Sequence, residues 1–189
     1  MGGAGSHNRA EDGNEMTGAD HYAVADLNAL SHADFVRIIG PVFEHSPWIA
    51  DLAAAKRPFA TFEHLRRGLC ETVQRASEAL QLGLIRAHPD LVGRAALAGT
   101  LTKESKGEQA SAGLDRLTPE EVAKFQSLNQ QYKEKFGFPF IICARLNKKE
   151  AILAGFERRL KHSRAEEIKT ALEEIFKIAE LRLKDLIHH

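Results

Sequence analysis

Two short polar segments are the strongest candidates for chemistry in this 189-residue chain. His88 stands directly before Pro89, and Ser105, Glu108 and Gln109 follow downstream. A histidine can give or take a proton at neutral pH, because the unperturbed pKa of its imidazole is about 6.5. A carboxylate and an amide nearby could orient that histidine or hold a polar ligand. If the two segments face each other, they form a small active site.

Each segment also has a purely structural interpretation. His88 could simply end one helix while Asp90 caps the next, because proline disfavours the α conformation in the residue before it. Ser105 and Glu108 fit the capping-box pattern, in which the serine bonds forward and the glutamate bonds back at a helix start. The functional alternative is a helix N-terminus that presents Ser105, Glu108, Gln109 and free N–H groups to a ligand. The two interpretations do not exclude each other.

Arg182 is a third candidate because of its place on the last predicted helix. On a helical wheel it lies beside Ile175 and Leu186, at the edge of the apolar stripe. A partly buried guanidinium needs an acceptor, either in a structural ion pair or on a ligand that bears a carboxylate or carbonyl. The wheel places the other charges of this helix on the opposite side: Glu173, Glu174, Lys177, Lys184 and Asp185.

The segment 136–142 breaks the helical period with apolar, aromatic and β-branched residues, and predicts a buried extended stretch. Its buried backbone groups need partners, because they lie outside a helix. These partners are either protein groups or the amide edge of a heterocycle. For the aromatic side chains, core packing is the simpler role.

Composition excludes several other functions. Lys+Arg and Asp+Glu both number 26, so net charge gives no case for binding nucleic acid or an anionic membrane. The nine histidines are scattered, and neither cysteine has a partner at metal-ligand spacing, so we expect no metal site. No phosphate-binding glycine loop or nucleophile elbow is present. Cys70 and Cys143 are expected to be free thiols of a reducing cytoplasm, and the start of the chain shows no signal-peptide pattern.

From Leu27 onward, apolar residues recur at helical spacing with no repeat and no convincing set of strands. The chain therefore predicts a single all-α domain over residues 21–187, with roughly seven to nine helices. Residues 1–20 are small, polar and aperiodic, and predict a disordered leader or an expression scar. His188 and His189 are either native or the remains of a tag.

Helix boundaries follow from capping residues and prolines. Gly40-Pro41 should kink or end one helix, and His88-Pro89 should end another. Ser46 and Pro47 predict a restart with a serine cap and proline in the first turn. The remaining predicted starts are Ser31, Thr61, Thr118-Pro119-Glu120-Glu121, Asn147-Lys148-Lys149-Glu150 and Ser163-Arg164-Ala165-Glu166, the last two as capping boxes.

Five motifs in order make the chain resemble the 2-oxo-4-hydroxy-4-carboxy-5-ureidoimidazoline (OHCU) decarboxylases of uric acid degradation. The resemblance covers roughly Leu27 to Leu186. The motifs are Gly40-Pro41-Val42-Phe43-Glu44-His45-Ser46-Pro47-Trp48, Arg57-Pro58-Phe59, His88-Pro89-Asp90-Leu91, Ser105-Lys106-Gly107-Glu108-Gln109 with Ala112-Gly113-Leu114, and Phe136-Gly137-Phe138-Pro139-Phe140. One departure is Val92, where the family often has glycine directly after the leucine, so the loop after the histidine could differ slightly in shape.

The resemblance implies an all-helical homodimer that decarboxylates OHCU to (S)-allantoin without a cofactor. It makes His88 the catalytic acid/base, and Glu108 and Arg182 its catalytic partners. The Arg182 match is the shortest, since it rests on Leu-Arg-Leu. The residues implied to contact the substrate are Pro89, Ser105, Gln109, Phe140, Ile141, Ile142, Cys143 and Ala144, the last five through their backbone.

These residues suggest a division of roles. We expect His88 to transfer protons at the substrate's hydroxyl and enolic system, while Glu108 holds His88 in one tautomer or binds ring N–H groups. Arg182 would stabilise charge on a substrate oxygen without gripping the leaving carboxylate tightly. Two alternatives stay open: a non-catalytic helical module that binds a ureide or acts as a scaffold, and a hydrolase, which would need an activated water.

Overall fold

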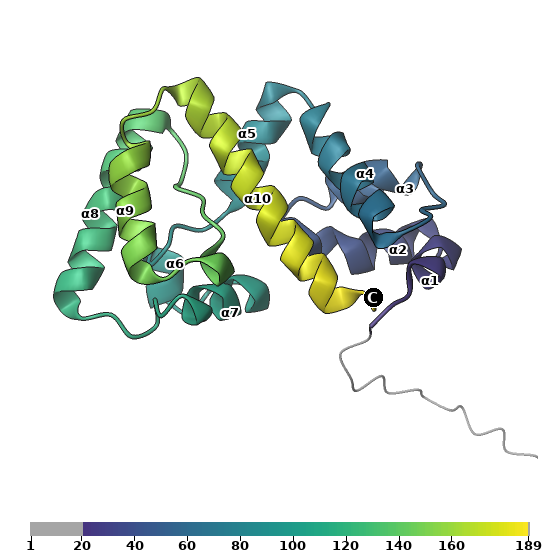
Figure 1. The fold of residues 1–189 in the computed structure, drawn as a ribbon, viewed down its shortest axis with the longest axis horizontal. Coiled ribbons are helices and arrows are strands. Elements are labelled where there is room, and N and C mark those ends of the chain that lie inside the picture. Colours follow the sequence, from purple (N-terminus) through teal and green to yellow (C-terminus); the bar gives the residue numbers. More distant parts are fainter. Residues whose placement is uncertain (1–20, 189) are drawn as a thin grey trace, which may run out of the picture.

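The computed structural model describes residues 21–188, most of which are helical (Figure 1). The predicted all-α class is confirmed, since these residues form ten α-helices, two 3₁₀ turns and an isolated bridge between Tyr22 and Ile187. The sequence predicted roughly seven to nine helices, and two of the ten are short: α1 (Val24–Ala29) and α6 (Arg94–Leu97). The predicted leader at 1–20 and His189 lie outside the described residues. None of the described helices is long and apolar enough to cross a membrane.

The longest helix, α10 (Arg164–Leu186), runs between two groups of shorter helices (Figure 1). It packs against α4, α5 and η1 of the first group. The first group comprises α1, α2 (His32–Ile39), η1 (Gly40–Val42), α3 (Trp48–Ala54), α4 (Phe62–Gln74) and α5 (Glu78–Ala87). The second group comprises α6, α7 (Lys103–Ser111), α8 (Pro119–Phe136), η2 (Ala144–Leu146) and α9 (Lys149–Arg159).

Local capping sets most helix boundaries where the sequence predicts them. Ser31, Thr61, Thr118 and Ser163 each accept a hydrogen bond from the N–H group three residues on, which satisfies an otherwise unpaired donor. Helix α5 ends at Ala87, and the next residue is extended with ψ 139° because a proline follows it. Cys70 and Cys143 are both free and buried, as the sequence predicted.

Two predicted helix starts are wrong in detail. Ser46 does not cap α3, because Pro47 already has helical angles and takes the N-cap position itself. The Asn147 capping box is absent as well: Lys148 is the N-cap of α9 and makes no side-chain cap bond. The amide of Asn147 instead donates to the carbonyl oxygen of Cys143 at 2.9 Å, and this competing acceptor turns the side chain away from α9.

The extended segment begins slightly later than expected. Helix α8 includes Phe136 and ends at Gly137, whose φ of +78° is the left-handed conformation that glycine adopts most easily at a helix end. Beyond it, residues 138–143 are not helical, and Phe138, Phe140 and Ile141 are buried. This stretch enters the core as predicted.

A buried ion pair anchors the extended segment. Arg159 on α9 and Glu167 on α10 are both almost fully buried, with Nε 2.9 Å from the carboxylate. The same guanidinium donates to the carbonyl oxygen of Ile141 at 2.5 Å and lies 4.3 Å from the ring centroid of Phe140. The hydroxyl of Tyr132 also donates to Glu167. Arg159 therefore holds both the backbone and a side chain of this stretch.

The helical wheel misplaced one residue of α10. It put Glu174 on the polar side, but this residue is buried and its carboxylate accepts a hydrogen bond from the backbone N–H of Cys143 at 2.8 Å. The wheel describes one helix, whereas the extended segment brings an unpaired donor to that face of α10.

Replacing Glu167 by glutamine should destabilise the fold by about 3–5 kcal/mol, because Arg159 would keep its charge in the core without a carboxylate. Glu173→Gln on the same helix is the matched control, since Glu173 pairs with Lys169 only at the exposed surface. Its effect should stay within about 0.5 kcal/mol. Urea unfolding followed by circular dichroism compares the two. Equal losses of stability would contradict the role of the buried pair.

Candidate active site

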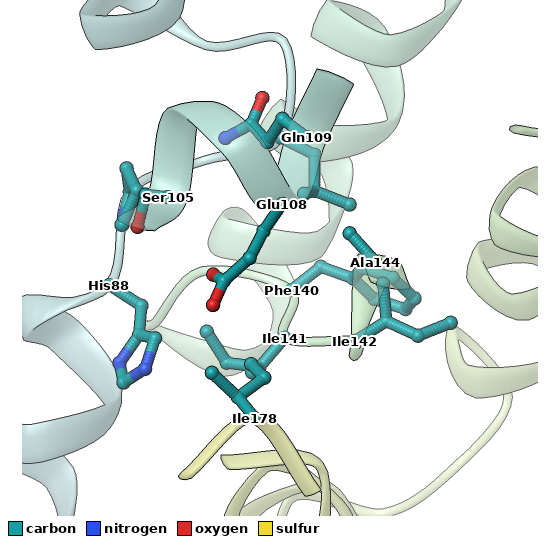
Figure 2. A pocket seen from close by; sticks show the side chains of 11 residues that line it. His88, Ser105, Glu108, Gln109, Phe140, Ile141, Ile142, Ala144 and Ile178 are labelled. Carbon is teal, nitrogen blue, oxygen red and sulfur yellow. The ribbon is translucent and has the colours of Figure 1, made fainter. Parts of the chain in front are cut away.

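The two segments singled out in the sequence face one small cavity that opens to solvent (Figure 2). It lies where the end of α5, the inner face of α7, the extended segment and α10 meet. The lining residues are His88, Pro89, Leu91, Ser105, Glu108, Gln109, Phe140, Ile141, Ile142, Ala144 and Ile178. Among the residues predicted for the site, Cys143 and Arg182 are not part of this lining.

His88 is held in one orientation by its own helix. It directly follows α5, and its Nδ1 lies 2.9 Å from the carbonyl oxygen of Leu84. Since a carbonyl only accepts, Nδ1 carries the proton and Nε2 is left as an acceptor. The tautomer of His88 is therefore set by Leu84 and not by Glu108, one of the two roles that the sequence suggested for the glutamate.

Burial keeps His88 neutral. The side chain is almost completely enclosed, which lowers the pKa of its imidazole to about 4, because a charged ring would be poorly solvated there. The bond to Leu84 and the charge of Glu44 oppose this shift, and the charges of Arg182 and His45 add to it. At neutral pH, His88 is a base with a free lone pair.

Ser105 and Glu108 do not form the predicted capping box. Helix α7 starts at Lys103 and is capped by Thr102, whose hydroxyl accepts from the N–H of Ser105. A threonine three residues before Ser105 takes the cap position first, so Ser105 lies in the first turn of α7 and Glu108 lies in the second. The predicted presentation of Ser105, Glu108 and Gln109 to a ligand stays a prediction. The side chains of Ser105 and Glu108 reach across to Glu44 and Arg182 on other elements.

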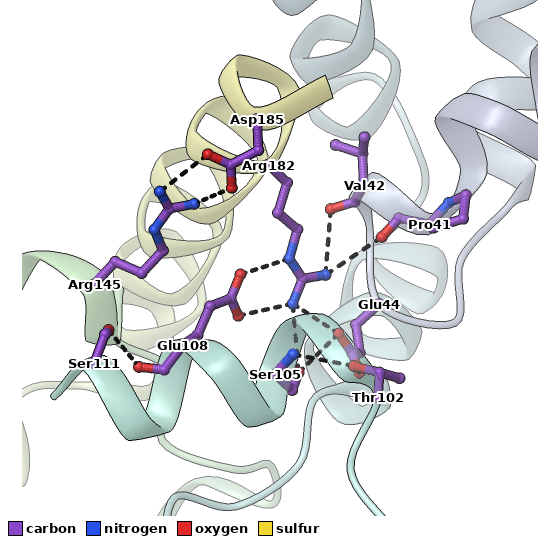
Figure 3. Close-up of polar contacts among 10 residues, drawn as sticks. All are labelled: Pro41, Val42, Glu44, Thr102, Ser105, Glu108, Ser111, Arg145, Arg182 and Asp185. Atoms are coloured by element: carbon purple, nitrogen blue, oxygen red, sulfur yellow. Dashed lines mark hydrogen bonds and ion pairs between the residues drawn. The ribbon is translucent and has the colours of Figure 1, made fainter. Parts of the chain in front are cut away.

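Glu108 and Arg182 form a two-pronged ion pair between α7 and α10 (Figure 3). Arg182 Nε lies 2.7 Å from Oε1 of Glu108, and Nη2 lies 2.8 Å from Oε2. Such paired bonds fix both position and direction of the carboxylate. The structure places the Arg182 guanidinium against Glu108 rather than among the residues lining the cavity. Its predicted contact with a substrate oxygen stays a prediction.

Glu44 is a member of this cluster that sequence reasoning missed. It is only 3% exposed, and its carboxylate accepts from Thr102 at 3.0 Å and from Ser105 at 3.1 Å (Figure 3). Arg182 Nη2 lies 3.0 Å from it. Burial alone would raise the pKa of Glu44, but the charge of Arg182, with further help from the hydrogen bonds and, in acid, from protonated His88, holds it below its usual value. A carboxylate beside the apolar Phe43 was the available signal.

Gln109 holds the loop that follows His88. Its side-chain oxygen accepts from the N–H of Val92 at 3.1 Å, and its amide donates to the carbonyl of Asp90 at 3.4 Å. Val92, the departure noted in the sequence, has φ of +52°, which is strained for a β-branched residue. Asn129 donates to the carbonyl of Leu91 at 2.7 Å, so two buried amides hold this strained turn.

The backbone of the extended segment is partly used by the protein itself. The carbonyl of Ile141 accepts from Arg159, and the N–H of Cys143 donates to Glu174. Cys143 is buried, and burial raises the pKa of its thiol. Within the described residues, no group of three or more His, Cys, Asp or Glu side chains is arranged to hold a metal ion.

A titration of the His88 imidazole by NMR should give a midpoint near pH 4. The physical reason is burial, which disfavours the imidazolium. His88→Asn identifies the resonance by its disappearance. A midpoint near the ordinary value of about 6.5 would show that water reaches the ring freely.

The comparisons agree on one family. The family model described as OHCU decarboxylase matches residues 28–184. The 2-oxo-4-hydroxy-4-carboxy-5-ureidoimidazoline decarboxylase of Halalkalicoccus jeotgali is 45% identical over 163 residues, covering 86% of this chain and 90% of the relative. The enzyme of the same name from Amia calva is 45% identical over 161 residues, covering 85% and 92%.

Solved structures also match the fold. A structure of (S)-allantoin synthase superposes with a TM-score of 0.69 at 30% identity, covering 88% of this chain and 54% of that chain. A structure of OHCU decarboxylase in the presence of (S)-allantoin gives a TM-score of 0.61 at 24% identity, covering 74% and 89%, which shows a shared fold. By its family model and its relatives, this chain belongs to the OHCU decarboxylase family.

Proposed function

We propose that this protein decarboxylates OHCU to (S)-allantoin in uric acid degradation, as a carboxy-lyase. The observation that carries the proposal is the cavity in which a buried, neutral His88 meets Glu108, Gln109 and the extended segment. Family membership supplies the substrate. The geometry supplies a base, a carboxylate and a set of backbone groups around one cavity.

The substrate can act as its own electron sink. One ring carbon carries the carboxylate and a hydroxyl, and the neighbouring ring carbon is part of a C=N bond. When the bond to the carboxylate breaks, its electron pair forms a carbon–carbon double bond, and the C=N pair moves to nitrogen, which takes a proton. The resulting enol then loses its hydroxyl proton and gains a proton on the neighbouring carbon. Overall, one proton is consumed and carbon dioxide leaves, so this chemistry requires no cofactor.

His88 is assigned to the proton transfers. Its Nε2 can accept the hydroxyl proton, and the imidazolium formed can return a proton to the ring. A base with a depressed pKa is a strong acid once it is protonated, which favours that return. The bond to Leu84 keeps Nε2 available throughout.

The other residues bind and orient the substrate. Glu108, fixed by Arg182, is placed to accept from ring or ureido N–H groups. Other predicted contact residues line the remaining faces of the cavity, and Cys143 does not: Pro89, Ser105, Gln109, Phe140, Ile141, Ile142 and Ala144. Protonation on a single face, which makes one enantiomer, requires such a fixed orientation.

The family resemblance further suggests a homodimer in the cytoplasm that binds neither nucleic acid nor membrane. Two free buried cysteines fit a reducing compartment. Light scattering tests the dimer directly, since the mass of a single chain is 20.9 kDa. A mass equal to that value would remove the dimer from the proposal.

Adding the protein to freshly made OHCU should accelerate loss of its ultraviolet absorbance and give the circular dichroism of (S)-allantoin alone. OHCU is made in the same cuvette from urate by urate oxidase and hydroxyisourate hydrolase. Decay at the spontaneous rate, ending in racemic allantoin, would overturn the proposal and favour a ureide-binding or scaffold module.

His88→Asn should lower turnover by about 10²–10⁴-fold, because it removes general acid/base catalysis. Asparagine approximates the size of the ring, so the variant should fold and still bind (S)-allantoin in calorimetry. Loss of turnover with retained binding separates a catalytic from a binding role. Turnover close to that of the unchanged protein would remove His88 from the mechanism.

A further inference from the structure

The cluster of ion pairs beside the cavity carries an excess of negative charge. It contains two carboxylates, Glu44 and Glu108, and a single guanidinium, Arg182. His88 adds no positive charge at neutral pH. A further arginine, Arg145, is already bonded to Asp185 at 2.5 and 3.1 Å (Figure 3). The cluster therefore has a net charge of −1.

Since Glu108 pairs with Arg182, Glu44 is the second carboxylate that leaves the cluster with its excess negative charge. Two hydroxyl groups donate hydrogen bonds to Glu44 in addition to its ion pair with Arg182. Thr102, the cap of α7, and Ser105, within α7, both donate to the Glu44 carboxylate. The hydroxyl of Ser105 lines the cavity on one side and is fixed by Glu44 on the other. Glu44 thus reaches the cavity through Ser105 and Arg182 without itself lining it.

An anionic cluster is unexpected beside a site for an anionic substrate. Like charges in a poorly solvated interior repel, so the cluster should weaken binding of the substrate's carboxylate. The reaction, however, starts from that anion and ends in neutral products after uptake of a proton. Repulsion in the bound state that is relieved as the charge is lost raises the rate of the chemical step.

We propose that Glu44 is a positioning residue whose buried charge, acting through Arg182 and Ser105, opposes the charged substrate and favours uptake of the proton that the reaction consumes. This inference rests on the proposed function. It assigns a role in the reaction to a carboxylate that does not line the cavity. A residue that only supports the fold would give a different kinetic pattern when replaced.

The surroundings of Glu44 identify the other groups that act on its charge. Arg182 faces it from α10, and His88 acts on it from the end of α5. His45 follows it in the chain, with Nε2 3.9 Å away and an exposed side chain. Glu104 lies on the exposed side of α7, and it lines a second surface pocket together with Glu44 and His45. Solvent screens these last two, whereas Arg182 is buried with Glu44.

Glu44→Gln tests the charge with little change of shape. We expect kcat to fall about tenfold or more and KM to fall about threefold or more, because removal of ground-state repulsion lowers both. The pKa of His88 should also fall below its value in the unchanged protein, since the anion that favours the imidazolium is gone. NMR measures this shift without substrate. Glu104→Gln removes an exposed carboxylate nearby and should leave kcat, KM and the His88 titration unchanged.

Glu44→Asp keeps the negative charge, but the shorter side chain places the carboxylate farther from Ser105 and Arg182. It should lower kcat several-fold without lowering KM, which separates positioning from charge. An unchanged kcat in Glu44→Asp would overturn the proposal, even if Glu44→Gln failed to fold. A raised KM with an unchanged His88 titration in folded Glu44→Gln would also overturn it, since a purely structural role predicts that result. If the unchanged protein does not turn over OHCU, the proposed function fails, while the His88 titration still reports on the charge of Glu44.

Discussion

The guanidinium of Arg182, bonded to Glu108 on one side and to Glu44 on the other, is the interaction on which the site depends. It joins α10 to α7 and to the chain just after η1, so three elements distant in sequence meet at one cation. Helix α10 lies between the two helical groups (Figure 1), and this contact fixes their relative placement where the cavity opens. Ser105 and Glu108 could not point into a defined space if α7 were free to turn.

Burying charges in this way has a large desolvation cost, which geometry must offset. Here the offset comes from paired bonds: each oxygen of Glu108 has its own N–H donor, and two hydroxyls complete the shell of Glu44. A second buried pair, Arg159 with Glu167, uses the same principle on the other side of the extended segment. Both pairs hold parts of the site that helical hydrogen bonds cannot hold. An apolar core would pack these helices as tightly, but it would not orient a carboxylate or a backbone carbonyl.

Local sequence patterns predicted the helices because their causes are local. A serine or threonine cap and a proline after His88 act within a few residues, and most of them have the predicted effect. The Ser105–Glu108 box failed for a local reason too, since Thr102 offers an earlier cap in the same register. Pairing across the fold is different. The sequence predicted that Arg182 needs an acceptor. Its partner Glu108 lies 74 residues away, however, and nothing in the local pattern identifies it. The buried ion pairs of Glu44 and Glu167 could not be predicted for the same reason.

The state of His88 shows why the fold and the chemistry cannot be separated. An exposed histidine before a proline would carry a proton for part of the time near neutral pH, whereas this one is kept neutral by burial and aligned by the carbonyl of Leu84. Burial alone would make its protonated form too costly to use. A nearby excess of negative charge, held behind Ser105 and Arg182, lowers that cost at the moment when the reaction needs a proton. The same charge repels the anion that must lose its carboxylate. The buried carboxylates therefore act on both the base and the bond that breaks, although only Glu108 lines the cavity.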